Sequence, residues 1–391
     1  MSHNPADREK IRNIKYLSWL IAFSIISIIL SDRIDYWMPE YAHMDQVKYR
    51  EMAEAAPNIN LEVDKPFSYR ILAPWIAGIS PFKVDVSFFI LNIATLILLV
   101  IAFYYFIIYH SISNRIAFGL TSCFIFNRYF FQFYSWDYFQ LCDTLSFLFL
   151  LLSLFFLFGN KWLKLACISL LGVLTKELAL LVIPIGYVFL VRKKATRSEF
   201  VKFTFSIVPA IVVFVGFRLL LKVNSGDELI DQFLYGAGKF FLPEVLAKKF
   251  IIAFIPFGLI PIIFFKEVVL FIKQNSHLFV YFLAVVFVSF FGDYERLMTP
   301  SAPVYYCFIA FVIQKYLPEE RSKSVLRNFL VVLIIMSFLS SFYHLWGLLQ
   351  LPNRDISIIS TVLLTLITAA AFVLIKYPNI RIAGWLGLND K

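Results

Sequence analysis

The sequence predicts an all-α polytopic membrane protein, because three features of its 391 residues agree. Hydrophobic residues make up 60% of the chain and charged residues only 16%, well below the quarter or so that is usual in soluble proteins. Several stretches, such as 86–109 and 356–375, are almost free of charge and reach the roughly 20 residues that cross a bilayer. The Lys and Arg residues lie mostly in short loops between such stretches, so the net charge of +10 indicates membrane orientation and no nucleic-acid partner.

The hydrophobic pattern predicts about twelve transmembrane or membrane-embedded helices. The N-terminus is basic and no cleavage site follows the first span, so we expect the first span to remain as an anchor and both termini to be cytoplasmic. Ten spans are predicted at 16–31, 86–109, 116–133, 141–158, 200–221, 250–265, 278–291, 301–313, 329–349 and 356–375, and the stretch 165–191 supplies two more short helices.

The stretch 165–191 is interrupted at Thr175, Lys176 and Glu177, and again at Pro184. As one crossing it would invert every later basic loop, whereas as a hairpin of two short helices it leaves those loops inside. We therefore predict a hairpin whose helices pack within protein or in a thinned bilayer. Adjacent residues point in different directions on a helix, so Lys176 and Glu177 at its tip are expected to have separate partners.

The whole chain, 1–391, is predicted to be one integral-membrane domain without an internal repeat. Within it we expect 16–222 to be a helix module that carries the chemistry, with its long outer loop at 32–85, and 223–391 to be a variable C-terminal helix module. The two matching halves with interrupted helices that many transporters have are not evident. The four cysteines lie in or beside hydrophobic spans and are interpreted as packing residues.

The outer loop 32–85 combines carboxylates, guanidiniums and aromatic side chains directly after the first span. Apolar residues between 41 and 54 recur at a spacing that predicts a helix lying on the membrane surface. Asp45 is then either part of an ordinary polar face or a carboxylate at the lipid–water boundary that can act as a general base. Tyr49 lies one turn further on.

The second segment of the loop contains Tyr69 and Arg70. Pro66 suits the first turn of a helix, which we expect to run toward the second span with a break at Pro74. The guanidinium of Arg70 is suited to phosphate recognition, although it could also extend toward lipid headgroups.

The predicted topology places charged residues from distant parts of the sequence in one layer at the outer helix ends. Charges within a membrane are costly and are normally tied to a partner or a site. Asp143 could cap its helix or, with Asp137, orient a base or a substrate. Arg296 is a second candidate for phosphate binding, or a residue of an ordinary loop. The layer comprises Asp45, Arg70, Asp137, Asp143, Lys176, Glu177, Glu295 and Arg296.

Together these residues resemble the GT-C superfamily of integral-membrane glycosyltransferases, which take sugars from polyprenyl-phosphate carriers. The resemblance extends roughly over residues 16–305. It depends on His43-Met-Asp-Gln-Val-Lys-Tyr-Arg-Glu-Met-Ala53, Pro66-Phe-Ser-Tyr-Arg-Ile-Leu-Ala-Pro74, Asp143-Thr-Leu145, Leu174-Thr-Lys-Glu177 and Glu295-Arg-Leu-Met-Thr-Pro300, in that order.

The resemblance implies transfer of a sugar from a polyprenyl phosphate to a glycan, lipid or protein acceptor on the non-cytoplasmic face of a bacterial inner membrane. One base and direct displacement imply inversion at the anomeric carbon. The base would be Asp45. The carrier phosphate would be held by Arg70, Lys176 or Arg296. From their places in the loop and in the charged layer, we expect the substrate to be bound or oriented by Tyr49, Tyr69, Asp137, Asp143, Glu177 and Glu295.

One departure from the family pattern and two rival functions accompany this hypothesis. Many family members have a tighter acidic pair in the first loop, whereas Gln46 follows Asp45, so Asp32 or Asp35 could be the base instead. No metal-ligand triad stands out, and the need for a divalent cation stays open. One rival is a transporter or flippase for a lipid-linked or anionic substrate. The other is a surface-polysaccharide polymerase or ligase that uses a polyprenyl-diphosphate oligosaccharide.

Overall fold

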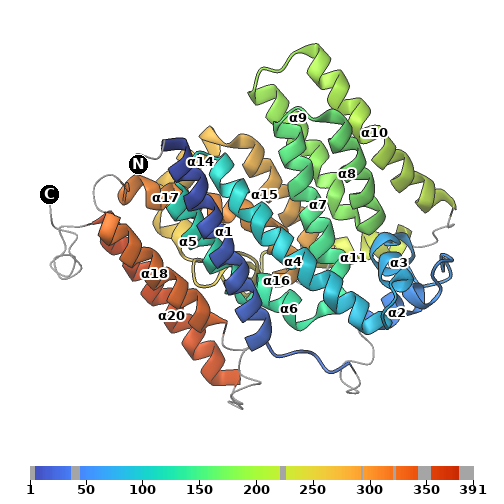
Figure 1. Cartoon of the computed structure of the whole chain (residues 1–391), viewed down its shortest axis with the longest axis horizontal. Helices are drawn as coiled ribbons and strands as arrows, with labels where there is room; N and C mark the ends of the chain where they lie inside the picture. Colours follow the sequence, from blue (N-terminus) through green and yellow to red (C-terminus); the bar gives the residue numbers. More distant parts are fainter. Residues whose placement is uncertain are drawn as a thin grey trace.

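The structure, a computed structural model, describes residues 5–36, 45–220, 226–291, 294–319, 323–341 and 354–377. All the regular elements in these residues are helices. In Figure 1, α18 and α20 lie side by side at one edge of the molecule, and α10 lies at the opposite edge. The α-helices are α1 (Pro5–Leu30), α2 (Gln46–Glu54), α3 (Leu72–Ile79), α4 (Val84–Tyr109), α5 (Asn114–Ile125), α6 (Phe133–Trp136), α7 (Leu141–Phe158), α8 (Trp162–Thr175), α9 (Val182–Arg192), α10 (Arg197–Leu220), α11 (Gly226–Lys239), α12 (Pro243–Phe250), α13 (Ile260–Ile263), α14 (Phe265–Gln274), α15 (Ser276–Val288), α16 (Tyr294–Met298), α17 (Ala302–Tyr316), α18 (Lys323–Ser340) and α20 (Arg354–Lys376).

Shorter turns of tighter or wider helix connect several of these elements. They are η2 (Phe67–Tyr69), η3 (Arg128–Gln132), η4 (Tyr138–Gln140), η5 (Glu177–Leu181), η6 (Ile252–Phe254), η7 (Ser289–Phe291) and η8 (Thr299–Ser301).

Seven helical stretches in the described residues are long and apolar enough to cross a membrane, as expected for a polytopic membrane protein. The pair α14 and α15, which meets at a bend of 110°, could count as an eighth. The remaining predicted spans are short or interrupted. The seven stretches are Ile11–Leu30, Val84–Tyr109, Tyr138–Phe158, Arg197–Leu219, Arg296–Tyr316, Lys323–Ser340 and Ile359–Lys376.

Helices α8 and α9 form a hairpin, with Lys176 and Glu177 at its tip. Helix α8 ends where Lys176 adopts an extended backbone, and η5 leads into α9. At the open end, Lys193 Nζ donates to Asn160 Oδ1 at 3.0 Å, so the beginning of α8 lies beside the end of α9. The 14 residues of α8 rise only about 21 Å, which is less than the roughly 30 Å of a hydrocarbon core. The short hairpin packs against α7, α10 and α15.

The prediction of a continuous helix over 250–265 is wrong. This segment consists of η6, an irregular stretch and the four-residue α13. A Cβ on Gly258 would lie 2.3 Å from the Ile251 carbonyl oxygen, so the backbone folds back too closely for any larger residue. Apolar composition alone does not distinguish such a segment from a regular helix.

Distant side chains supply the hydrogen bonds that this irregular backbone lacks. Asn127 Nδ2 donates to the Ile255 carbonyl at 2.7 Å, Tyr305 Oη to Phe257 at 3.0 Å and Lys376 Nζ to Ile263 at 3.0 Å. Non-helical backbone is tolerated at membrane depth when protein satisfies it in this way. The predicted span 116–133 is interrupted as well, because α5 ends at Ile125 and Asn127 begins the wide turn η3.

Three hydrophobic clusters occur among the described residues, and the two largest organise most of the helices. The larger one lies between the long helices, including α4, α5, α7 and α17. The smaller one holds α2, α3 and η4 against the end of α4 and the start of α7. The smaller cluster therefore positions the polar loop that follows α1. Its buried members include Tyr49, Met52, Ile71, Ala77, Phe88 and Phe139.

Candidate functional site

Charged side chains gather where α2, α3 and η4 meet the hairpin tip and α16. In Figure 1, α2, α3 and α6 lie near the ends of α4 and α7 that are remote from the start of α1. The predicted break at Pro74 is wrong. Helix α3 begins at Leu72, so Pro74 lies in its first turn, where a missing N–H is tolerated. The chain bends instead at Arg70, between η2 and α3.

Asp45 immediately precedes α2, but its carboxylate does not cap that helix. Its Oδ2 atom lies 3.5 Å from Arg296 Nη1 and accepts a hydrogen bond from Gln140 Nε2 at 3.4 Å. The side chain is 32% exposed, so the carboxylate is both positioned and reachable. Three segments far apart in sequence thus converge on this group.

Gln140 connects Asp45 to a second, fully buried carboxylate. The same Nε2 atom donates to Asp137 Oδ2 at 3.1 Å, and Tyr36 Oη donates to Asp137 Oδ1 at 2.7 Å. Burial raises the pKa of Asp137 to about 6, although these hydrogen bonds oppose the rise. Burial and the neighbouring Asp137 carboxylate likewise raise the pKa of Tyr36. Asp137 is therefore a buried acid that titrates close to neutral pH.

Arg70 lies between an aromatic residue of α2 and the tip of the hairpin. Its Nη1 donates to Tyr49 Oη at 3.1 Å, and its Nη2 donates to Glu177 Oε1 at 3.1 Å. Burial opposes ionisation of Glu177, but Arg70 and Lys176 outweigh it and lower the pKa of Glu177 to about 2. Tyr49 is completely buried, so its hydroxyl is a fixed hydrogen-bond partner for Arg70.

Tyr69 faces a further guanidinium, that of Arg218 at the end of α10. The Arg218 Cζ atom lies 4.7 Å from the Tyr69 ring centroid and 3.7 Å from that of Phe214. Glu177 and Arg70 are among its electrostatic neighbours, yet no carboxylate of the described residues lies within ion-pair distance of Arg218. The Tyr69 hydroxyl and the Arg70 Nε atom are buried without a hydrogen-bond partner among those residues. The Tyr69 hydroxyl and Arg70 Nε are therefore donors near Arg218 that are available to a ligand.

Lys176 and Asp143 form the most deeply buried ion pair of the layer. Their Nζ and Oδ1 atoms are 2.5 Å apart, and both side chains are nearly inaccessible. Asp143 accepts no capping bond at the start of α7, where Gln140 occupies the cap position. Lys176 and Glu177 thus have different partners, Asp143 and Arg70.

The other predicted residues are exposed or have side chains outside the described residues. Asp32 and Asp35 are exposed in the chain that follows α1. Glu295 belongs to α16, but its side chain lies outside the described residues, as does His43. No group of three or more His, Cys, Asp or Glu side chains with metal-binding geometry occurs in the part of the chain that the structure describes.

Three residues of the site were not predicted from the sequence, namely Tyr36, Gln140 and Arg218. Tyr36 and Gln140 are neutral, so they give no charge signal in an apolar background. Arg218 lies near the end of an apolar span, where an arginine is an ordinary boundary residue. The polar character of 132–143 as a whole was the available signal for Gln140.

Comparisons of the chain with protein-family models, with curated proteins and with solved structures found no match.

Proposed function

We propose that this chain is a GT-C-type glycosyltransferase that moves a sugar from a polyprenyl phosphate to an acceptor hydroxyl. The proposal is carried by one observation: a reachable carboxylate, Asp45, shares a layer at the helix ends with Arg70, Lys176, Arg296 and Arg218. A base beside a group of cations is what displacement of a lipid phosphate requires.

In the proposed reaction, Asp45 accepts the proton of the acceptor hydroxyl. The acceptor oxygen then forms a bond to the anomeric carbon from the face opposite the carrier. The bond between that carbon and the phosphate oxygen breaks, and its electron pair leaves with the polyprenyl phosphate. The product is inverted at the anomeric carbon. The departing phosphate is already a stable anion, so cations suffice to stabilise it and no strong acid is needed.

Most of the cations already have carboxylate partners. Arg296 is paired with Asp45, Lys176 with Asp143 and Arg70 with Glu177. A phosphate must therefore share these cations or displace a carboxylate. Arg218 is the exception among the described residues of the cluster. It lies over the ring of Tyr69, whose hydroxyl has no hydrogen-bond partner among those residues. We therefore assign the first contact of the carrier phosphate to Arg218 and Tyr69, with Arg70 completing the site.

The proposed orientation places both termini in the cytoplasm of a bacterial cell and the charged layer at the non-cytoplasmic face of the inner membrane. The support is the basic N-terminal segment of α1, which begins at the end of the molecule remote from the charged layer. A carrier lipid could then rest its tail in the bilayer and present its sugar to the aqueous phase.

Turnover by the purified protein tests the proposal. Protein in detergent micelles, given a polyprenyl-phosphate sugar and an acceptor, is expected to release free polyprenyl phosphate and form a product inverted at the anomeric carbon. Asp45→Asn should abolish release while carrier binding is retained. Movement of an intact lipid-linked sugar across proteoliposomes without release would instead indicate a flippase. Turnover only with a polyprenyl-diphosphate oligosaccharide would indicate a polymerase or ligase.

A further inference from the structure

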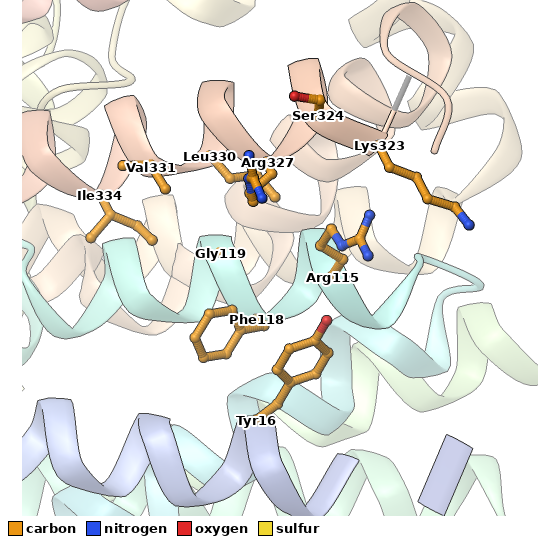
Figure 2. Close-up of a pocket in the computed structure, with 10 residues that line it drawn as sticks. All are labelled: Tyr16, Arg115, Phe118, Gly119, Lys323, Ser324, Arg327, Leu330, Val331 and Ile334. Carbon is orange, nitrogen blue, oxygen red and sulfur yellow. The ribbon is translucent and has the colours of Figure 1, made fainter. Parts of the chain in front are cut away.

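A groove lies at the opposite end of the molecule from the charged layer, between α1, α5 and α18. It encloses about 530 Å³, within the roughly 300–1,000 Å³ typical of ligand pockets. Figure 2 shows Lys323 and Arg115 toward one end of the groove and Val331 and Ile334 toward the other. The groove is lined by Tyr16, Arg115, Phe118, Gly119, Lys323, Ser324, Arg327, Leu330, Val331 and Ile334.

Three cations line this groove and only one of them has a carboxylate partner in the described residues. Arg115 Nη1 lies 3.2 Å from Glu319 Oε1. Lys323 and Arg327 are exposed, and no carboxylate of the described chain lies within ion-pair distance of either. The groove therefore presents a net positive charge, which an anionic group can neutralise.

The rest of the lining is apolar. Helices α5 and α18 meet so closely that a Cβ on Gly119 would lie 2.9 Å from a Leu330 methyl group, which closes the floor of the groove. On the other side, the ring of Phe118 stacks on Tyr16 of α1 at 4.7 Å. Val331 is 48% exposed, and Ile335 one turn further along α18 is 46% exposed, so the apolar end of the groove opens onto an exposed apolar surface.

We infer that this groove binds one anionic phospholipid. Its phosphate lies against Lys323 and Arg327, and an acyl chain runs past Val331 and Ile334. The groove is cationic at one end and apolar at the other, as a phospholipid has a charged headgroup at one end and acyl chains at the other. Basic pockets between transmembrane helices bind such headgroups. A free anion would satisfy the cations but leave the apolar end of the groove empty. The inference does not depend on the proposed function.

Retention of lipid by the purified full-length protein tests this inference. The protein is exchanged into non-ionic detergent, mixed with dioleoyl-phosphatidylglycerol or dioleoyl-phosphatidylcholine, and examined by native mass spectrometry. We expect one phosphatidylglycerol to be retained with an affinity about tenfold above that for phosphatidylcholine. Lys323→Gln combined with Arg327→Gln should reduce phosphatidylglycerol affinity about tenfold, because each cation near a lipid headgroup contributes favourably.

A second variant, Val331→Trp, fills the apolar end and leaves the cations in place. It should also weaken phosphatidylglycerol binding, whereas inorganic phosphate should not displace the lipid at millimolar concentration. The matched control is Lys161→Gln with Lys164→Gln, two exposed lysines at the start of α8 outside the groove, which should retain lipid as the unmodified protein does. Equal retention of the two lipids would overturn the inference. Displacement of phosphatidylglycerol by inorganic phosphate alone would also overturn it. A protein dimer that dissociates in the Lys323→Gln, Arg327→Gln variant would do so too, because a second copy of the chain would then occupy the groove.

Discussion

Lys176 Nζ and Asp143 Oδ1 lie 2.5 Å apart, and this contact joins the tip of the α8–α9 hairpin to the start of α7. Neighbouring Glu177 binds Arg70, so the two residues of the tip hold two different parts of the structure. The hairpin thereby links the loop between α1 and α4 to the long helices.

Loss of Lys176 should destabilise the protein. Lys176→Met leaves the Asp143 carboxylate buried without its nearest cation, and breaking a buried pair in this way typically costs about 3–5 kcal/mol. We expect a clearly lower unfolding temperature of the detergent-solubilised protein by differential scanning fluorimetry. The double variant Lys176→Met, Asp143→Asn should recover much of the loss, since neither position of the pair then carries an uncompensated charge. A double variant as unstable as the single one would contradict this account.

Asp45→Asn should reduce turnover of a polyprenyl-phosphate sugar by about 10²–10⁴-fold, the usual contribution of a general base. The amide can still accept the hydrogen bond from Gln140 but cannot take a proton. Release of polyprenyl phosphate measures the effect. The controls are Asp32→Asn and Asp35→Asn, both in exposed positions, which should retain most activity. If either control abolished release while Asp45→Asn did not, the base would have to be moved to that residue.

Arg218→Gln should weaken donor binding more than it slows the chemical step. A charge-assisted hydrogen bond is worth roughly 1.5–3 kcal/mol, so the KM for the lipid-linked sugar should rise about tenfold or more with a smaller change in kcat. Steady-state kinetics with varied donor separates the two constants. Arg33→Gln is the matched control, because Arg33 is exposed and lies over Phe89, 4.2 Å from its ring centroid. Equal effects of both changes would point to general surface charge.

The stability of the protein should depend on pH through Asp137. Its pKa is raised from 3.8 to about 6, so the folded state binds the proton more tightly than the unfolded state between these values. Protonated Asp137 therefore stabilises the folded state by about 3 kcal/mol, as calculated from that pKa shift. This stabilisation is complete below pH 3.8 and is lost as the pH rises through about 6. Unfolding temperatures measured from pH 4 to 7 should therefore fall less steeply in Asp137→Asn. An identical pH dependence in both proteins would reject the assignment.

The hairpin could be predicted because its signal is local. A Lys and a Glu interrupt an apolar stretch, and separate partners were predicted for them from helical geometry. Lys176 and Glu177 do have different partners, although Lys176 itself is extended and not helical. Asp45 and Arg296 were predicted to share a layer by alternating the expected spans. The structure brings their side chains to 3.5 Å, although 250–265 is not the continuous helix that this prediction counted.

Other features depend on tertiary contacts that leave no mark in the pattern. The segment after α12 has the apolar composition of a span, yet close packing at Gly258 and side chains from other helices hold it in an irregular path. Gln140 links Asp45 and Asp137 only because η4 ends beside α2. Arg218 belongs to the site only because α10 ends beside Tyr69.

Lys376, near the end of α20, donates to the carbonyl of Ile263 in that irregular segment. A carbonyl about two thirds of the way along the 391 residues therefore accepts a hydrogen bond from a residue 113 positions further on. Until α20 is in place, the Ile263 carbonyl has to bond water or another donor, because an unbonded carbonyl in an apolar interior is costly. A chain truncated before α20 would lack this donor for the Ile263 carbonyl.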